Sequence, residues 1–364
     1  MPRSILAALL VILFFPLVGI ADWPVFRGDA TMTGAGTAKL PDKLDVKWEF
    51  KTGDGVEGAP AIVNGVVYVA SLDKHLYAID LATGQQKWKV KLGPMKASPS
   101  VKGEYVYVGN LDGTFFCLKT ADGSKVWQFE TMGMIMAGCN FHGSNILIGS
   151  HDSTLYCLDA SGKKLWEVKT EGPVNGAPAV IGDVTFVAGC DSILHILDAK
   201  TGKELGTVEL DGQAAATAAV LGDFAYVGTM ANTVVAVDLK KKAKVWTFEA
   251  TVRQQPFYAS AAAGEVIVAG SRDKKVYGLN PKTGKEVWNF KTDGQVDASP
   301  VIVGDRVYVG SLSDDGNFYV LDMKTGKKLQ ELMLDSAVSG SVGVGPDCLV
   351  VGTDKGTVYC LGKK

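Results

Sequence analysis

The chain has 364 residues, of which 47% are hydrophobic, and its 37 Lys and Arg residues nearly balance 39 Asp and Glu residues. Since nucleic-acid binders carry a concentrated positive patch, a net charge of −2 without a basic block argues against DNA and RNA as partners. The six cysteines show no C-x-x-C spacing, so the sequence gives no sign of a zinc ribbon or of covalent haem.

The first 21 residues have the parts of a secretory signal peptide. Arg3 precedes an apolar run from Ile5 to Val18, and small residues follow it. We predict cleavage after Ala21. A retained membrane anchor is the alternative, although the run is short for a membrane span and Pro16 interrupts it. No cysteine follows the cleavage site, so we expect a periplasmic or secreted chain that neither spans the membrane nor carries a lipid anchor.

After a lead-in at residues 22–43, residues 44–364 repeat one pattern about every forty residues. Each copy has an apolar strand, a hairpin that usually contains Asp, an alternating strand, a turn that is often Thr-Gly, and a last strand that carries Trp. The frame is complete from Ala78 to Trp88. The tryptophans of this frame, which we expect to dock between repeats and to donate to a carbonyl, are Trp48, Trp88, Trp127, Trp166, Trp246 and Trp288.

Two copies lack the docking ring, because Gly206 and Gln330 occupy its place. We expect weaker contacts between neighbouring repeats at these two positions.

The two ends of the chain complete one another. An eighth copy stops before its last strand, and residues 46–50 form a last strand with nothing before it. Four-stranded units of this kind leave open edges, and they hide these edges by closing into a ring. The sequence therefore predicts an all-β fold, a single and monomeric eight-bladed β-propeller of four-stranded antiparallel blades whose last blade is closed by the N-terminal strand.

Small residues are expected at two kinds of position in the repeat. The innermost strand is built from Gly, Ala, Ser and Pro, because eight such strands crowd around one axis. Three of the cysteines, Cys117, Cys157 and Cys360, fall on the third-strand position of Ala78. We interpret them as buried thiols that act as small apolar residues.

The frame Ala-x-Asp-x-x-Thr-Gly-x-x-x-Trp at residues 78–88, nearly repeated at residues 278–288, resembles the tryptophan-docking motif of PQQ-like β-propellers. The lead-in from Asp22 to Asp29 is similar to that of bacterial exported members. The resemblance allows two branches: quinoprotein dehydrogenases, with pyrroloquinoline quinone and calcium, and non-enzymatic propellers similar to the outer-membrane assembly factor BamB. The chain lacks the insertions, haem domain and Cys-Cys pair of the dehydrogenases, so the second branch is favoured.

One position in each blade departs from the uniform frame. It lies just before the innermost strand and is occupied by Glu57, Lys96, Met136, Asn175, Ala215, Tyr258, Asp297 and Ser339. We expect these residues to line the mouth of a central channel. By resemblance to the dehydrogenases, Glu57, Asn175 and Asp297 would bind the quinone and its calcium ion, since calcium prefers carboxylate and amide oxygens. The spacing around the ring argues against this site, and we expect no cofactor, no metal site and no catalytic residue.

Two loops that should emerge on the same face are candidates for a protein contact. Residues 131–136 place Met132, Met134 and Met136 at alternate positions, and Met adapts well to binding surfaces. Residues 251–258 contain Arg253, Phe257 and Tyr258, residue types common in interface hot spots. A loop folded onto its own blade is the alternative for each.

The sequence therefore favours a scaffold that binds a protein partner in the cell envelope and is not an enzyme. A quinone- and calcium-dependent oxidoreductase and a glycan- or peptide-binding module are the alternatives.

Overall fold

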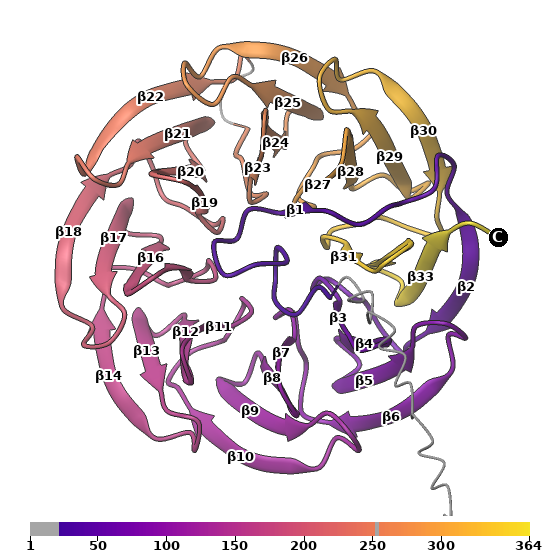
Figure 1. The fold of residues 1–364 in the computed structure, drawn as a ribbon, viewed down its shortest axis with the longest axis horizontal. Coiled ribbons are helices and arrows are strands. Elements are labelled where there is room, and N and C mark those ends of the chain that lie inside the picture. The colour runs from indigo at the N-terminus through magenta and orange to yellow at the C-terminus, as the bar shows by residue number, and fades with distance from the viewer. Residues whose placement is uncertain (1–21, 252–254) are drawn as a thin grey trace, which may run out of the picture.

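The computed structural model describes residues 22–251 and 255–364, and within them the chain forms strands without a helix. Eight sheets stand around one axis as the blades of a ring (Figure 1). The predicted eight-bladed propeller is confirmed. The predicted signal peptide lies outside the described residues. Over the ranges that are described, no helix is long and apolar enough to cross a membrane.

Each blade begins with a short strand at the axis and ends with a strand on the outer wall. Blades 1 to 4 comprise β3 (Ala61–Val63), β4 (Val66–Ala70), β5 (His75–Asp80), β6 (Gln86–Lys91); β7 (Ser100–Lys102), β8 (Tyr105–Gly109), β9 (Thr114–Lys119), β10 (Lys125–Glu130); β11 (Asn140–His142), β12 (Asn145–Ser150), β13 (Thr154–Leu158), β14 (Lys164–Lys169); and β15 (Ala179–Ile181), β16 (Val184–Ala188), β17 (Ile193–Asp198), β18 (Glu204–Glu209).

The remaining blades follow the same order. Blades 5 to 8 comprise β19 (Ala219–Leu221), β20 (Phe224–Gly228), β21 (Thr233–Asp238), β22 (Ala243–Glu249); β23 (Ala262–Ala263), β24 (Ile267–Ser271), β25 (Lys275–Leu279), β26 (Glu286–Lys291); β27 (Val301–Val303), β28 (Arg306–Gly310), β29 (Asn317–Asp322), β30 (Lys328–Met333); and β31 (Gly343–Val344), β32 (Cys348–Gly352), β33 (Thr357–Gly362) with β2 (Asp45–Lys51).

The N-terminal strand closes the ring as predicted. β2 pairs antiparallel with β33, so the fourth strand of blade 8 comes from the start of the chain. One pairing was not predicted, because β1 (Ala35–Gly36) adds to blade 7 as a fifth strand, parallel to β27.

The residue opposite each docking tryptophan is small. The cross-strand partners of the six tryptophans, in the order of the tryptophans, are Cys360, Ala78, Cys117, Cys157, Ala236 and Gly278. Gly206 and Gln330 face the larger Ile196 and Val320 instead. The third-strand position is therefore small where an indole lies over it. This explains Cys117, Cys157 and Cys360, which are buried free thiols.

The indoles dock between neighbouring blades. Five of them donate from Nε1 to a carbonyl of the next blade over 2.8–3.0 Å, and the acceptors are Leu81, Thr120, Ala160, Pro281 and Met323. Trp166 alone has no partner for this donor among the described residues. The predicted carbonyl bond is confirmed at five of the six positions.

Residues 23–36 of the lead-in form a plug inside the ring (Figure 1). Its backbone bonds to the innermost segments of blades 1, 2, 4, 5, 6 and 7 in turn, through Trp23, Pro24, Ala30, Thr31, Thr33 and Gly34. The Asn140 side chain joins blade 3 to the same Ala30 carbonyl over 2.7 Å. The plug thus replaces water as the hydrogen-bond partner of the inner strands.

Arg27 anchors the plug. Its side chain is fully buried and donates to the carbonyls of Ala261 (3.0 Å) and Pro300 (2.5 Å) and to Ser341 Oγ (3.3 Å), which belong to blades 6, 7 and 8. A Cβ on Gly34 would lie 1.9 Å from this guanidinium, so the position requires glycine. Burial lowers the pKa of Arg27 to about 9, which still leaves the group charged at pH 7.

Candidate functional site

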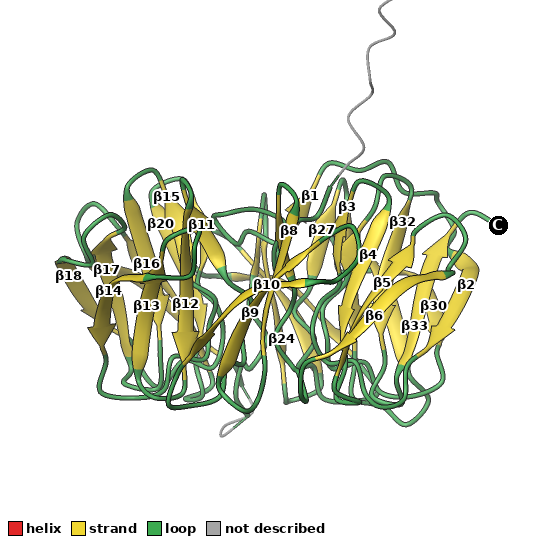
Figure 2. Cartoon of the chain, turned by 90° about the horizontal axis from the view of Figure 1, so that it is seen from below, coloured by secondary structure: helices red, strands yellow, loops and turns green. Residues whose placement is uncertain are grey.

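The mouth of the channel lies on the face that carries the interblade loops, at the bottom of Figure 2. We call it the mouth face. The eight predicted ring residues, Glu57, Lys96, Met136, Asn175, Ala215, Tyr258, Asp297 and Ser339, together line a cavity of about 320 Å³. The predicted ring is therefore present, because the loop before each innermost strand points one side chain at the axis.

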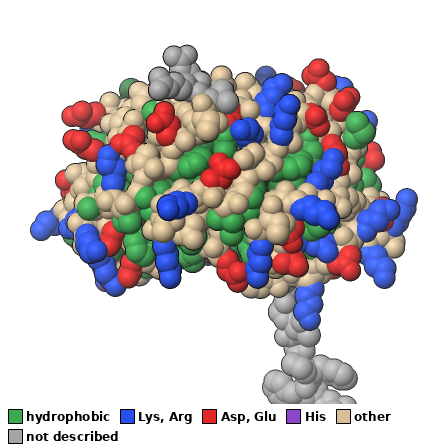
Figure 3. Space-filling model, turned by 90° about the horizontal axis from the view of Figure 1, so that it is seen from above, with side chains coloured by type: hydrophobic (Ala, Val, Ile, Leu, Met, Phe, Trp, Pro, Cys, Tyr) green, Lys and Arg blue, Asp and Glu red, His purple; other side chains and the backbone are tan. Residues whose placement is uncertain are grey.

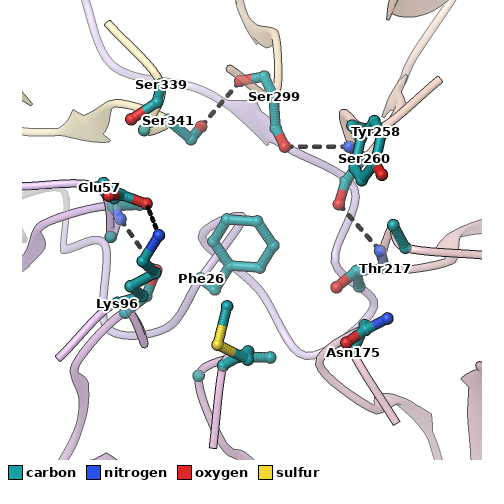
Figure 4. A pocket seen from close by; sticks show the side chains of 18 residues that line it. Phe26, Glu57, Lys96, Asn175, Thr217, Tyr258, Ser260, Ser299, Ser339 and Ser341 are labelled. Atoms are coloured by element: carbon teal, nitrogen blue, oxygen red, sulfur yellow. Dashed lines mark hydrogen bonds and ion pairs between the residues drawn. The ribbon is translucent and has the colours of Figure 1, made fainter. Parts of the chain in front are cut away.

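A smaller cavity of about 160 Å³ lies beneath this ring. Phe26, which the plug supplies, also lines it and stands at the centre of the close view (Figure 4). The residues two positions after the ring residues are Ala59, Ser98, Gly138, Ala177, Thr217, Ser260, Ser299 and Ser341, and all but Ala177 line this cavity. The plug thus closes the channel below the mouth.

Hydroxyl groups of this second tier tie neighbouring blades together. Ser98 Oγ accepts the amide hydrogen of Ala59 over 2.9 Å, and Ser299 Oγ accepts that of Ser260 over 3.0 Å. The same bond joins Ala177 to the Thr217 hydroxyl over 2.7 Å. These bonds fix the polar wall of the channel and leave little rotational freedom to its side chains.

One side of the mouth is charged. Lys96 pairs with Glu57 over 2.7 Å, and Arg272 holds both oxygens of Asp297 over 2.8 and 2.6 Å. The Arg272 guanidinium also lies 3.8 Å from the centre of the Tyr258 ring. Its hydrogen bonds to Asp297 raise the pKa of Arg272. The geometry is that of a bidentate pair stacked on an aromatic face, a rigid arrangement that holds the tyrosine in place.

Asp354 continues this charged side. Its carboxylate accepts the Ser339 hydroxyl over 2.5 Å. Burial, together with the charge of Glu57, raises the pKa of Asp354. The side therefore holds three carboxylates near two cations, and it offers a polar, ion-paired surface.

The other side of the mouth is uncharged and mostly apolar. Met136 and Ala215 flank Asn175, whose Nδ2 lies 2.9 Å from Cys190 Sγ. The mouth thus divides into a charged half and an uncharged half, a pattern that suits oriented binding of one partner surface.

Each residue proposed as a calcium or quinone ligand already has another side chain as its partner. Glu57 pairs with Lys96, Asp297 with Arg272, and Asn175 with Cys190. In residues 22–251 and 255–364, no group of three or more His, Cys, Asp or Glu side chains could hold a metal ion. As arranged, Glu57, Asn175 and Asp297 do not fit a calcium shell, which requires oxygens within about 2.3–2.6 Å of one ion.

Two of the three methionines in the loop at residues 131–136 are exposed. Met132 is 93% exposed and Met134 is 41% exposed, whereas Ile135 between Met134 and Met136 is buried in the core of blades 2 and 3. Asp152 accepts the amide hydrogen of Met132 over 2.9 Å, so the tip of the loop is fixed while its side chain is free.

The second candidate loop is different from the prediction. Phe257 is fully buried and packs against Phe248 and Tyr277, so it is a core residue and its assignment to a partner surface was wrong. Tyr258 reaches the mouth cavity. Arg253 lies outside the described residues. A departure from the repeat shows that a loop differs from the equivalent loops of the other blades, but it does not show which of its side chains point outward.

Sequence reasoning missed Arg272, Asp354 and Phe26. Arg272 and Asp354 occupy equivalent turn positions, which Leu72, Leu111 and Leu312 fill in other blades, and this charge substitution was a usable signal. Phe26 gave none, because it belongs to the plug and not to a repeat.

A family model described as outer membrane protein assembly factor BamB matches residues 42–133 and 117–241, more than half of the chain. The chain belongs to this BamB family. A crystal structure of BamB from Moraxella catarrhalis has a TM-score of 0.75 at 18% identity, covering 88% of this chain and 98% of that one. A search of curated proteins finds no match.

Two dehydrogenases share the same fold. A europium-containing methanol dehydrogenase has a TM-score of 0.76 at 13% identity, covering 94% of this chain and 98% of that chain. The quinohemoprotein alcohol dehydrogenase from Comamonas testosteroni has a TM-score of 0.79 at 14% identity, covering 94% and 81%. At such identities the similarity shows a shared fold alone. The choice between a binding scaffold and a dehydrogenase therefore rests on the residues of the site.

Proposed function

We propose that this member of the BamB family is a non-enzymatic scaffold that binds a protein partner of the bacterial cell envelope on its mouth face. The observation that carries the proposal is the exposed methionine loop beside a half-charged ring. Met132 and Met134 offer an adaptable apolar contact, and the charged half supplies orientation. We place the protein in the periplasm or outside the cell, as its family and its first 21 residues suggest.

Site-specific photo-crosslinking tests this face. A photo-reactive residue placed at Met132 is expected to give one defined adduct in cells, whereas the same residue at Val287 on the outer wall gives none. Figure 3 shows that wall, where hydrophobic side chains lie among charged ones. Equal adducts at Met132 and Val287, or none at either, would contradict the proposal.

Mutation of the loop gives a second readout. Met132→Ser with Met134→Ser is expected to weaken recovery of the crosslinked partner about tenfold or more, since central apolar contacts dominate interface affinity. Val126→Ser is the matched control, because Val126 is an exposed apolar residue of the same region on the outer wall of blade 2, 44% exposed. A loss of the same size in the control would point to a structural cause.

The oxidoreductase is the second candidate, supported by the dehydrogenase neighbours and by the cavity at the mouth. Titration with pyrroloquinoline quinone and calcium, followed by calorimetry and quinone absorbance, separates the two. The scaffold proposal expects no saturable binding. One-to-one binding at micromolar affinity that is lost in Glu57→Ala with Asp297→Ala would overturn it.

A further inference from the structure

One junction between blades lacks its docking ring and is filled only in part, by a lysine side chain. Where β18 of blade 4 meets blade 5, Gly206 stands in place of Trp, Ile196 lies opposite it, and Lys242 replaces the turn glycine. A groove of about 420 Å³ opens here. Its apolar lining comes from Ile181, Val184, Phe186, Ile196, Leu205 and Leu239.

The other junction without a docking tryptophan is closed by the chain itself. The Gln330 amide accepts from the amide of Leu44 over 2.9 Å and donates to its carbonyl over 2.7 Å. Leu44 is buried there in the core of blades 1, 7 and 8. The open groove is therefore a property of the blade 4–5 junction and not a general result of losing the tryptophan.

The other junctions show what shape this groove accepts. At each of six junctions an indole lies between two blades, and at five of them it donates to the carbonyl that follows the third strand. The equivalent carbonyl at the open junction belongs to Leu239. No hydrogen-bond donor among the described residues reaches it.

The charge at the rim is positive and incompletely paired. Lys240 pairs with Asp223 over 2.7 Å, Lys241 with Asp238 over 3.5 Å. Lys242 instead extends over Gly206, where its Cδ lies 2.6 Å from the position of an added Cβ, and donates to the Leu205 carbonyl. In the part of the chain that the structure describes, Lys242 pairs with no carboxylate.

We infer that this groove binds a tryptophan side chain of a second protein, with an acidic residue next to it. The indole displaces the flexible Lys242 side chain from its place over Gly206, lies on Ile196 and Leu205 and donates to the Leu239 carbonyl. The displaced ammonium of Lys242 then pairs with the neighbouring carboxylate. The groove lies near the turn after β21 and the β15–β16 and β19–β20 hairpins, on the face opposite the mouth. It is thus a second interaction surface, independent of the mouth face.

A small probe tests the inference directly. The peptide acetyl-Gly-Trp-Asp-Gly-amide, labelled with 5-fluorotryptophan, is titrated with the full chain and followed by ¹⁹F NMR. We expect saturable binding with a dissociation constant of about 1 mM or tighter, the affinity range of a single buried aromatic side chain. The same peptide with Ala for Trp is followed by competition and should not compete, and one with Lys for Asp should bind more weakly.

Matched variants assign the binding to the groove. Leu205→Ser is expected to weaken binding about tenfold, whereas Val287→Ser, the equivalent outer-strand position of blade 6, leaves it unchanged. The triple variant Ile196→Ala, Gly206→Trp, Lys242→Gly copies the Ala236, Trp246 and Gly284 arrangement and should abolish binding. Three results would overturn the inference: no saturable binding, binding unchanged in Leu205→Ser, or a dimer of this chain that occupies the groove and is lost in Leu205→Ser.

Discussion

Replacing Arg27 by alanine is expected to lower the free energy of unfolding by about 3–5 kcal/mol, because the change leaves buried hydrogen-bond acceptors of three blades without their shared donor. The plug should also loosen, since Arg27 joins it to blades 6, 7 and 8. Urea denaturation followed by tryptophan fluorescence measures the loss. Limited proteolysis within residues 23–36 measures the release of the plug.

Arg306 provides the control. It donates to the Asp42 carbonyl over 2.7 Å and pairs with its carboxylate over 2.6 Å, outside the channel. Because Asp42 is almost fully exposed, Arg306→Ala is expected to cost only about 1 kcal/mol or less and to leave the plug protected. Equal losses in the two variants would show that the buried anchor has no special role.

Replacing Trp288 by alanine is expected to cost about 3–5 kcal/mol, the usual loss for a buried aromatic side chain. Trp288 is the most buried of the docking tryptophans and donates to the Met323 carbonyl over 2.8 Å. Trp127→Ala should cost less, because Trp127 lies in a more exposed position and makes the same bond to Ala160. Thermal and urea unfolding of the two variants measure the difference.

A substitution at Gly278, the cross-strand partner of Trp288, tests the same contact. A Cβ on Gly278 would lie 2.1 Å from the Trp288 ring, so Gly278→Val must displace the ring. We expect a loss close to that of Trp288→Ala, and the double variant should lose little more, since both remove one contact. Losses that add in full would contradict docking at this pair.

Most of the fold could be predicted from the sequence repeat. The forty-residue period and the unmatched strands at the two ends predicted eight blades and their closure by β2, because each blade repeats the same local pattern. The small third-strand position of Cys117, Cys157 and Cys360 was also predicted, whereas the indole that lies over it was found only in the structure. The ring at the mouth was predicted for the same reason.

The plug and the ion pairs of the mouth did not follow from the repeat. Arg27 bonds to backbone carbonyls far along the chain, and any residue type supplies a carbonyl, so the sequence carries no trace of its partners. Phe257 was assigned wrongly because an irregular loop has no period from which to tell its buried side. Arg272 marks the intermediate case, where comparison of equivalent turns could have found the residue but not its partner Asp297.

The closure of the ring also determines when the fold can be completed. Arg27 and β2 are synthesised early, yet they bond to Ser341 and β33, which come last. The first six blades can each form from four consecutive strands, whereas blades 7 and 8 take β1 and β2 from the other end of the chain and are completed last. Joining the ends is thus the longest-range step of folding, and a chain truncated near its C-terminus would leave β2 without its partner strand and Arg27 without one of its three acceptors.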